Sequence, residues 1–374
     1  MATATLKAIT FGSLDDLLDA ICEKLQLRPT EYQLAEQRYE GIGTYLDRHK
    51  LLSPFRPRVY PQGSVVLGTT VRPKGRQEHD IDLVCELQIE PSAVPNPVAV
   101  LDLVQQSIQE SEVYRRLTER KNRCIRLNYV GKFHLDILPA CPDRSSGGTC
   151  VVVPDCRAQA WKASNPEGYA AWFKSRCEAG ATALLARAAN LPKPEAVADK
   201  APLKLAVQLA KRARDVQFSS NADLAPRSVI LTTLFAIHYS GEESTFQAVD
   251  NILSGILRSV PATARLVVLN PMNAQEDFSE SWREQRQYFA FLSFLREFTA
   301  SWQELRTASG IQNIKAILEK LFGEDITSDV VQDQVKRLNE ARAQSSLGIA
   351  GAGILTHVPA PTVRPVPRHT YHGR

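Results

Sequence analysis

The stretch YPQGSVVLGTTVRPKGRQEHDIDLVCEL, residues 60–87, contains the pattern that decides the fold of this chain. Its last part, residues 80–87, is an apolar run that begins with two aspartates and reads as a strand. Successive side chains of a strand point to opposite faces, so Asp80 and Asp82 project together while Ile81 faces the core. Such a strand presents two carboxylates on one face of a sheet.

A Gly-Ser pair precedes this strand. Gly63 and Ser64 stand at the start of a short helix that we expect at residues 64–68. Glycine lets the backbone approach a phosphate closely, and serine adds a hydroxyl donor. The pair is therefore suited to hold a triphosphate near the carboxylates.

A third aspartate lies in a second apolar strand, FHLDIL, at residues 133–138. Leu135 and Ile137 face the core there, and Asp136 faces the other way. Neighbouring strands lie about 4.8 Å apart, so three carboxylates converge if this strand lies beside residues 80–84. A divalent metal such as Mg²⁺ relieves the repulsion between them. An Asp-x-Asp strand alone is more often a solvated face, so the metal site is inferred from the complete set.

The composition is that of an ordinary globular protein. The chain has 374 residues, 44% hydrophobic and 23% charged, which suits two packed lobes. A net charge of +4 does not indicate a nucleic-acid binder. We expect neither a membrane span nor a signal peptide, because no long apolar run is present. Seven cysteines without a CxxC pair are typical of reduced thiols, which predicts a cytoplasmic protein.

Four regions are expected along the chain. Residues 1–50 are predicted to form an N-terminal helical arm, and residues 51–165 an α/β catalytic core. Residues 166–344 are predicted to form a helical domain. Residues 345–374 are rich in Gly, Ala and Pro, which predicts a flexible tail that buries no core.

Periodicity and turn signals predict the elements within these regions. Helices are expected at 14–26, 30–50, 97–118, 166–178, 201–217, 227–239, 245–258, 278–306, 310–322 and 327–344. Strands 123–130 and 132–139 are expected to form a hairpin around Gly131, and residues 150–155 one more strand.

Taken together, these residues resemble a known family. The set G-S, D-I-D and L-D-I-L is similar to the core of DNA polymerase β-type nucleotidyltransferases. More closely, residues 10–340 resemble the CD-NTases, the cGAS/DncV-like nucleotidyltransferases of bacterial antiphage (CBASS) systems. The similar stretches also include SNPEGYAAWF (164–173), PLKLAVQLAKRARD (202–215), RSVILTTLFAIHYSGE (227–242) and LNPMNAQEDFSESW (269–282). The resemblance implies an α+β fold: a polymerase β-like nucleotidyltransferase core with a mixed sheet, packed on a C-terminal helical lobe. The active site of this bilobed molecule is expected in the cleft.

The resemblance assigns the motif residues to metal and phosphate. Asp80 and Asp82 match the carboxylates that bind two Mg²⁺ ions, for which Mn²⁺ can substitute. Asp136 matches the third carboxylate, which holds the catalytic metal. Gly63 and Ser64 match the phosphate-loop pair.

Two residues are matched on the helical side. Lys211 resembles a lysine that contacts the triphosphate, and Ser228 resembles a serine that helps to hold it. For a lysine on a helix the usual alternative is a solvated face. Val229 departs from relatives such as cGAS, which place a base-stacking aromatic there, so the sequence does not identify the base-stacking residue.

The implied function is synthesis of a cyclic di- or trinucleotide second messenger from ATP and other NTPs by two-metal phosphoryl transfer. The family suggests adenine-containing products. An alternative is a template-independent nucleotidyltransferase that acts on RNA, protein or a small molecule. A degenerate scaffold without activity is disfavoured because the motif residues are intact. Nucleic-acid binding is not expected, although KRARD (211–215) is basic.

The tail ends in RHTYHGR. It resembles the C-termini of CD-NTases from operons that encode ubiquitin-like conjugation enzymes, which join a terminal glycine to a target. Gly373 matches that glycine, and Arg374 after it departs from the pattern. A conjugation or activator protein is therefore a candidate partner, and a tail without a role is the alternative.

Overall fold

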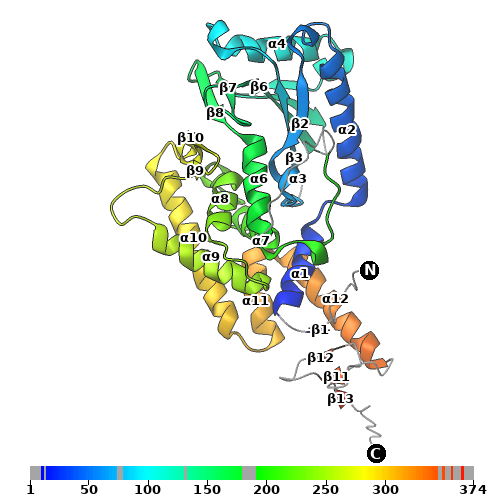
Figure 1. Cartoon of the computed structure of the whole chain (residues 1–374). Helices are drawn as coiled ribbons and strands as arrows, with labels where there is room; N and C mark the ends of the chain where they lie inside the picture. The colour runs from blue at the N-terminus through cyan, green and yellow to red at the C-terminus, as the bar shows by residue number, and fades with distance from the viewer. Residues whose placement is uncertain are drawn as a thin grey trace, which may run out of the picture.

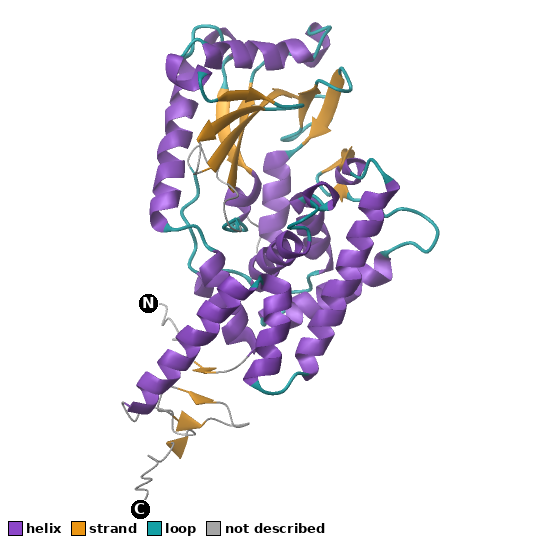
Figure 2. Cartoon of the chain, turned by 180° about the vertical axis from the view of Figure 1, so that it is seen from behind, coloured by secondary structure: helices purple, strands orange, loops and turns teal. Residues whose placement is uncertain are grey.

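The computed structural model describes residues 10–11, 14–73, 79–129, 133–178, 191–343, 348–349, 355–356 and 364–365. Figure 1 shows two lobes, one built on a mixed sheet and the other of helices. Seen from behind in Figure 2, the sheet lies beneath helices at the top of the molecule, and helices make up most of the lower lobe. No helix within the described ranges is long and apolar enough to cross a membrane.

The sheet of the upper lobe has the strand order β2-β3-β6-β5-β4, and β7 and β8 extend it from β6. These strands are β2 (Arg58–Gln62), β3 (His79–Glu86), β4 (Thr118–Arg120), β5 (Ile125–Tyr129), β6 (Phe133–Pro142), β7 (Val151–Asp155) and β8 (Ala160–Ser164). Strands β3 and β6 are parallel, and the other paired strands are antiparallel. The two aspartate strands are direct neighbours, as the sequence predicts.

Helices cover one face of this sheet. They are α2 (Pro29–Arg48), α4 (Val98–Gln109) and the short α5 (Glu112–Arg115). Ile81, Leu83 and Ile137 pack against residues of α2 and α4 in one apolar cluster. Because side chains alternate along a strand, burial of these residues leaves the neighbouring aspartates on the opposite face. That face looks toward the helical lobe (Figure 1).

The lower lobe packs around α7. Its helices are α1 (Leu14–Leu25), α6 (Pro166–Cys177), α7 (Pro202–Gln217), α8 (Ser228–His238), α9 (Thr245–Ser259), α10 (Gln285–Thr307), α11 (Ile311–Phe322) and α12 (Glu324–Ala343). Pro202 opens α7 at a position where a missing N–H costs nothing, and residues Leu203 to Ala213 are almost all buried. α7 packs on α1, α8, α9 and α11.

Short elements complete the two lobes. They are α3 (Gly63–Leu67), the 3₁₀ turns η1 (Ser53–Phe55), η2 (Pro91–Ala93), η3 (Val197–Asp199), η4 (Ala222–Leu224) and η5 (Phe278–Ser281), and the hairpin of β9 (Leu269–Asn270) and β10 (Asn273–Asp277). Strand β10 lies against β8, so this hairpin of the helical lobe reaches the sheet lobe.

Most predicted elements are present, with three corrections. The helix expected at 97–118 is two helices, α4 and α5, because Ser111 ends one and caps the next, and residue 118 begins a strand. The helix expected at 278–306 begins only at Gln285, after η5. Strands β4, β8, β9 and β10 were not expected. The β5–β6 hairpin is confirmed, although Gly131 itself lies outside the described residues.

The two ends of the chain meet in a small sheet. Strand β1 (Thr10–Phe11) pairs with β12 (Leu355–Thr356), and β11 (Gly348–Ile349) pairs with β12 and with β13 (Arg364–Pro365). Gly373 and Arg374 lie outside the described residues. The predicted N-terminal arm is divided: α1 belongs to the apolar cluster of the helical lobe, and α2 to that of the sheet lobe.

Candidate active site

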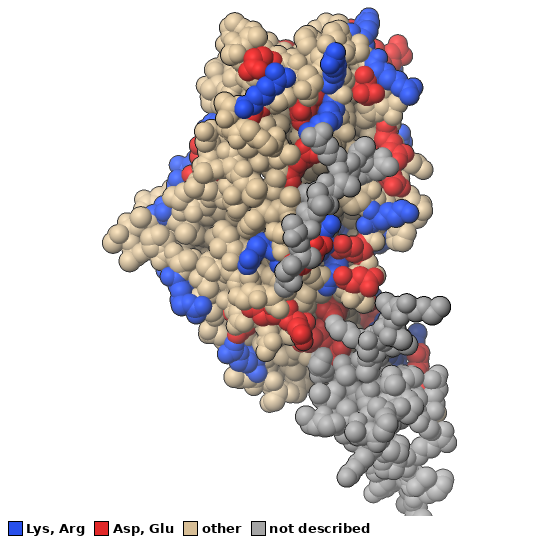
Figure 3. Space-filling model, viewed as in Figure 1, with Lys and Arg blue, Asp and Glu red and all other residues tan. Residues whose placement is uncertain are grey.

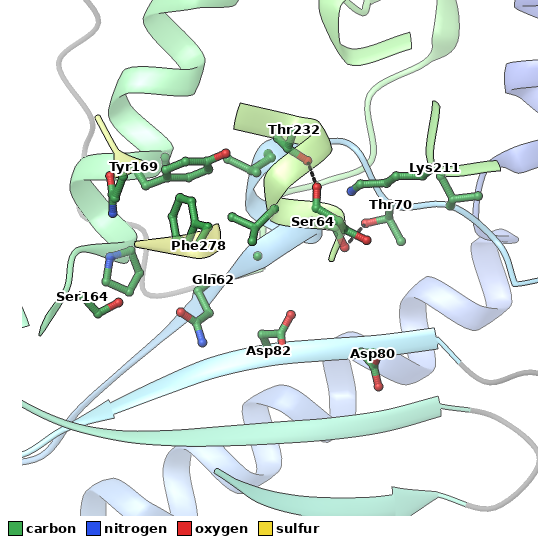
Figure 4. Close-up of a pocket in the computed structure, with 18 of the residues that line it drawn as sticks. Gln62, Ser64, Thr70, Asp80, Asp82, Ser164, Tyr169, Lys211, Thr232 and Phe278 are labelled. Atoms are coloured by element: carbon green, nitrogen blue, oxygen red, sulfur yellow. Dashed lines mark hydrogen bonds between the residues drawn. The ribbon is translucent and has the colours of Figure 1, made fainter. Parts of the chain in front are cut away.

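A cavity of about 1060 Å³ lies between the two lobes. The sheet contributes Asp80, Asp82 and Arg126 to its walls, and the helical lobe contributes Lys211 and Ser228. Figure 4 shows Asp80 and Asp82 on a strand at one side, with Ser64, Thr70 and Lys211 across the cavity from them. The cavity therefore collects residues from distant parts of the chain, which the sequence predicts as one site.

The three aspartates are held together by strand register. Asp82 on β3 is directly opposite Asp136 on β6, and Asp80 is opposite His134. All three carboxylates belong to the face opposite the apolar cluster, as expected from the alternation of side chains. Their convergence, inferred above only on the condition that the strands are neighbours, is confirmed by this pairing.

An arginine already neutralises part of this charge. Arg126 on β5 donates from Nε to Asp136 Oδ1 and from Nη2 to Asp136 Oδ2, both at 2.8 Å. The same guanidinium lies 3.1 Å from Asp80 Oδ1. Bidentate arginine–carboxylate pairs are strong and directional. Arg126 thus binds two of the three carboxylates in this structure.

Burial and mutual repulsion raise the pKa values of Asp82 and Asp80. The pKa of Asp82 is raised to about 7, first by burial and then by the nearby charges of Asp136 and Asp80. The pKa of Asp80 is also raised by burial, and Arg126 partly offsets this shift. Such a group of carboxylates gains most from a cation close to all of them.

The donor set fits a divalent ion once Asp136 is released. No three Asp, Glu, His or Cys side chains in the described ranges are arranged to hold a metal as they stand. At this site Arg126 takes both oxygens of Asp136. Carboxylate oxygens are the ligands that Mg²⁺ prefers, and Asp82 is the member that Arg126 leaves without a bond.

The Gly-Ser pair lies directly against these carboxylates. Gly63 has φ of 70°, a left-handed conformation that favours glycine, and a Cβ there would stand 2.5 Å from Asp82 Oδ2. Any larger residue would fill the space between the loop and the carboxylate. Ser64 accepts a hydrogen bond at Oγ from the Thr70 hydroxyl at 3.3 Å, which directs its side chain along the cavity (Figure 4).

The helical wall supplies the positive charge. Lys211 is buried, and its amine donates to the backbone oxygen and the hydroxyl of Thr69, both at 3.0 Å. Burial, and then the nearby charge of Arg214, lower its pKa to about 7. Ser228 accepts from Arg214 Nη1 at 2.5 Å. The structure therefore places both helical residues at the cavity, and Lys211 is not a solvated surface lysine.

The far end of the cavity combines aromatic and polar groups. Phe278 and Tyr169 meet edge to face, with ring centroids 5.8 Å apart. Glu276 is partly buried and lines the same cavity. It accepts hydrogen bonds from Ser164 Oγ at 2.9 Å, Asn165 N at 3.2 Å and Asn270 Nδ2 at 2.7 Å. Burial raises the pKa of Glu276 above its ordinary value, and these hydrogen bonds offset part of the rise. A flat, hydrogen-bonding group fits this end best.

Sequence reasoning missed several of these residues. The sequence did contain the information needed to find Arg126. In a hairpin centred on Gly131, Arg126 stands five residues before the centre and Asp136 five residues after it, so the two residues are paired across the strands. Glu276 and Phe278 lie in the stretch 269–282 that resembles the family, but the spacing of its residues predicted neither the hairpin and turn that hold them nor a role for either side chain. Val229, where an aromatic was absent, lines the cavity beside Ser228.

Charge on the outer surface is mixed. On the face shown in Figure 3, basic and acidic side chains are interspersed around a broad uncharged area. This distribution agrees with the low net charge of the sequence.

Comparisons with known proteins give the family. Residues 13–176 match the model of the Second Messenger Oligonucleotide or Dinucleotide Synthetase domain. A c-di-GMP synthase of Roseivirga ehrenbergii is 31% identical over 367 residues, which cover 96% of this chain and 97% of that protein. The cyclic dinucleotide synthase CdnG of Bradyrhizobium diazoefficiens is 25% identical over 388 residues, covering 94% of this chain and 90% of that protein.

A solved structure supports the same conclusion for the fold. The CD-NTase CdnG of Bradyrhizobium diazoefficiens in complex with GTP superimposes with a TM-score of 0.70 at 23% identity, covering 86% of this chain and 98% of that one. The predicted polymerase β-like core packed on a helical lobe is thereby confirmed. Gly63, Ser64, Asp80 and Asp82 line one cavity, and Asp136 stands opposite Asp82 on the neighbouring strand. Since a relative also matches over nearly the whole length, this chain belongs to the CD-NTases, the nucleotidyltransferases that make cyclic oligonucleotide second messengers in CBASS-type antiphage defence.

Proposed function

We propose that this enzyme joins two GTP molecules into cyclic di-GMP in a Mg²⁺-dependent reaction. The observation that carries the proposal is Glu276, a partly buried carboxylate that lines the same cavity as Phe278, Asp80 and Asp82. Guanine presents two N–H donors along one edge, whereas adenine presents an acceptor at the corresponding ring nitrogen. The Roseivirga relative, a c-di-GMP synthase, supports the same base.

We propose a guanine product in place of the adenine-containing product that the family resemblance suggests. A carboxylate oxygen accepts hydrogen bonds and cannot donate while ionised. Glu276 already accepts from Ser164 Oγ, Asn165 N and Asn270 Nδ2, and a carboxylate has about four acceptor positions, so one position remains for a guanine N–H donor. Phe278 is the aromatic surface that Val229 does not supply.

The aspartates act as the metal-binding group. Asp80 and Asp82 would hold both Mg²⁺ ions, and Asp136 would complete the catalytic site after exchanging Arg126 for metal. Bound Mg²⁺ would neutralise the triphosphate and favour ionisation of the attacking ribose hydroxyl. Mn²⁺ has similar ligand preferences and is expected to substitute.

The remaining residues position the nucleotide. Gly63 allows the triphosphate to approach the backbone, and Ser64 and Ser228 are placed to donate hydroxyl hydrogen bonds to it. Lys211 supplies positive charge for the departing pyrophosphate. The ribose hydroxyl of one GTP attacks the α-phosphorus of the other in line, its proton leaves, and the bond to pyrophosphate breaks. A second round within the linear dinucleotide closes the ring.

Product analysis tests this proposal. Purified protein is incubated with Mg²⁺ and each labelled NTP alone and in mixture, treated with phosphatase, and analysed by chromatography and mass spectrometry. A phosphatase-resistant cyclic di-GMP formed from GTP alone supports the proposal. A different cyclic product would refute the base assignment, and a linear extension that requires an added acceptor would favour the alternative nucleotidyltransferase.

We also propose the division of the chain into a helical arm (1–50), whose two helices pack on different lobes, a catalytic core (51–165), a helical domain (166–344) and a tail (345–374). The tail's terminal sequence supports a conjugation or activator partner that uses Gly373. A cytoplasmic location is supported by the seven cysteines, all free. If the tail serves conjugation only, truncation after Val363 leaves synthesis in vitro unchanged, and a loss of activity would contradict this role.

A further inference from the structure

The segment that follows α3 determines where Ser64 stands. Gly68 turns the chain with φ of 67°, and the next two residues return to Ser64. Thr69 N donates to the Ser64 backbone oxygen at 3.0 Å, and the Thr70 hydroxyl donates to Ser64 Oγ at 3.3 Å. The position of the phosphate-loop serine therefore depends on the position of Thr69 and Thr70.

The helical lobe holds this segment from its other side. Gln208 on α7 is fully buried and donates from Nε2 to the Thr70 backbone oxygen at 2.6 Å. One turn further along α7, Lys211 binds Thr69. Gln208 is thus the residue through which the core of the helical lobe contacts the residue that binds Ser64.

The orientation of the Gln208 amide is fixed by two donors. Its Oε1 accepts from Gln26 Nε2 at 3.2 Å and from Lys200 Nζ at 3.4 Å. Lys200 also donates to Gln26 Oε1 at 2.6 Å, and Gln26 Nε2 donates to the Cys22 backbone oxygen at 2.7 Å. A flipped Gln208 would direct its NH₂ at both of these donors, so only the observed orientation satisfies the group and leaves Nε2 for Thr70.

We propose that Gln208 is a positioning residue for the triphosphate: through Thr70 it fixes the Ser64 hydroxyl at the β- and γ-phosphates. The proposal rests on the proposed function in that Gly63 and Ser64 bind the triphosphate. It is independent of the base and of the product. Gln208 is not in the wall of the cavity and reaches the nucleotide only through Thr70 and Ser64.

Two substitutions separate positioning from a purely structural role. In Gln208→Glu the carboxylate keeps its hydrogen bonds from Gln26 and Lys200 and forms an ion pair with the lysine, so we expect the fold to be retained. Its second oxygen, however, stands where an N–H donor met the Thr70 oxygen, and the two acceptors repel each other. In Gln208→Met the side chain makes no hydrogen bond and leaves the buried Lys200 amine with one acceptor fewer, which destabilises the fold more.

The experiment measures the affinity for inorganic tripolyphosphate with Mg²⁺ by calorimetry, beside the melting temperature of each variant. Tripolyphosphate carries no base, so the measurement does not depend on which nucleotide is the substrate. Ser64→Ala reports whether the phosphate loop binds this ligand as the proposed function requires. Gln217→Met is the matched control, because Gln217 is exposed on the same helix.

We expect Gln208→Glu to weaken tripolyphosphate binding roughly tenfold while it melts close to the wild type, and Gln208→Met to melt lower yet bind better than Gln208→Glu. Full-length enzyme should show a raised KM for NTP in Gln208→Glu, with a smaller change in kcat. Unchanged affinity in Gln208→Glu while Ser64→Ala weakens binding overturns the positioning role. Affinities that follow the melting temperatures would overturn it as well, because a structural role alone explains them.

Discussion

The two walls of the cavity are built by different means. On the sheet wall, Asp80, Asp82 and Asp136 are fixed by the register of two parallel strands, with Arg126 placed by the next strand. On the helical wall, Lys211 and Ser228 come from helices whose positions depend on packing around α7. The sheet wall gathers three carboxylates around one arginine, and the helical wall combines the basic Lys211 and Arg214 with the acidic Asp215 and Glu276.

This difference determines how each wall responds to substitution. Strand register fixes where a side chain stands on the sheet, so losing one carboxylate removes a proposed metal ligand that no neighbouring residue is placed to replace. On the helical wall we propose that Lys211 acts on phosphate through charge, and Arg214, which pairs with Asp215, lies close enough to offset part of its loss. We therefore expect large effects from the sheet wall and smaller ones from the helical wall.

The largest effect is expected from Asp80→Ala combined with Asp82→Ala. Loss of both metal ligands should lower product formation by at least on the order of 10³-fold, since charge stabilisation in the transition state is usually the largest catalytic contribution. The rate of cyclic product formation, measured under saturating NTP and Mg²⁺, gives this number directly.

Asp102→Ala is the matched control for that loss. Asp102 is exposed on α4 and pairs with Arg120 at the surface, where an ion pair contributes little. Its activity should equal that of the wild type. Activity retained in the double variant at a tenth or more of the wild-type rate, a cut-off of about 1.4 kcal/mol, would exclude these aspartates as the metal group.

A smaller effect on rate but a clear effect on base choice is expected from Glu276→Gln. The amide can offer a donor where the carboxylate only accepts, so preference for GTP over ATP should fall by roughly 10- to 100-fold. The ratio of kcat/KM values for the two nucleotides measures this preference. Glu280→Gln, at an exposed carboxylate that pairs with Lys162, should leave the ratio unchanged. An unaltered ratio in Glu276→Gln would show that another group reads the base.

Replacing Arg126 measures how much the carboxylates of the sheet wall destabilise the fold when no cation is close to them. Without metal, Arg126→Met leaves Asp136 and Asp80 without their cation and should lower the free energy of unfolding by about 1–3 kcal/mol. The melting temperature in EDTA should fall by a few degrees, and Mg²⁺ should restore most of it because the ion replaces the missing charge. Arg120→Met removes an ion pair at the surface. In this variant we expect neither the fall of the melting temperature in EDTA nor the matching recovery with Mg²⁺. A variant that Mg²⁺ fails to stabilise would contradict metal binding by this group.

The sheet wall was also the part that the sequence predicted best. Apolar residues at every second position identify both strands and place Asp80, Asp82 and Asp136 on the face away from the core, and the complete set of motif residues then indicates a metal site. Gly63 and Ser64 were found for the same reason: they adjoin a strand that the pattern predicts. What local pattern left open was whether the two strands are neighbours, and the β3–β6 pairing supplies that.

The helical wall could be predicted only by resemblance. A lysine such as Lys211 lies on a helix where periodicity cannot distinguish a buried amine from a solvated one, and its burial results from packing against Thr69, far away in the chain. Glu276 is harder still, since its role depends on a short hairpin folded against β8. Contacts of this kind are fixed by tertiary packing, which sequence spacing does not encode.

The smallest effect is expected from the pH dependence of the helical wall. Burial lowers the pKa of Lys211 to about 7, below its value in the unfolded chain, so between about pH 7 and pH 10 the unfolded state binds more protons. Buried charge at Lys211 therefore costs stability below pH 7, and the cost diminishes as pH rises toward 10.

Triphosphate favours the charged amine, so binding takes up a proton above pH 7 and affinity should fall several-fold between pH 7 and about pH 9. Lys211→Met should bind more weakly at pH 7 but lose this dependence, whereas Lys174→Met, at an exposed lysine of α6, should keep it. Equal pH slopes in wild type and Lys211→Met, measured by calorimetry with Mg²⁺ and GTP, would assign the proton to another group and leave the helical wall without its titrating cation.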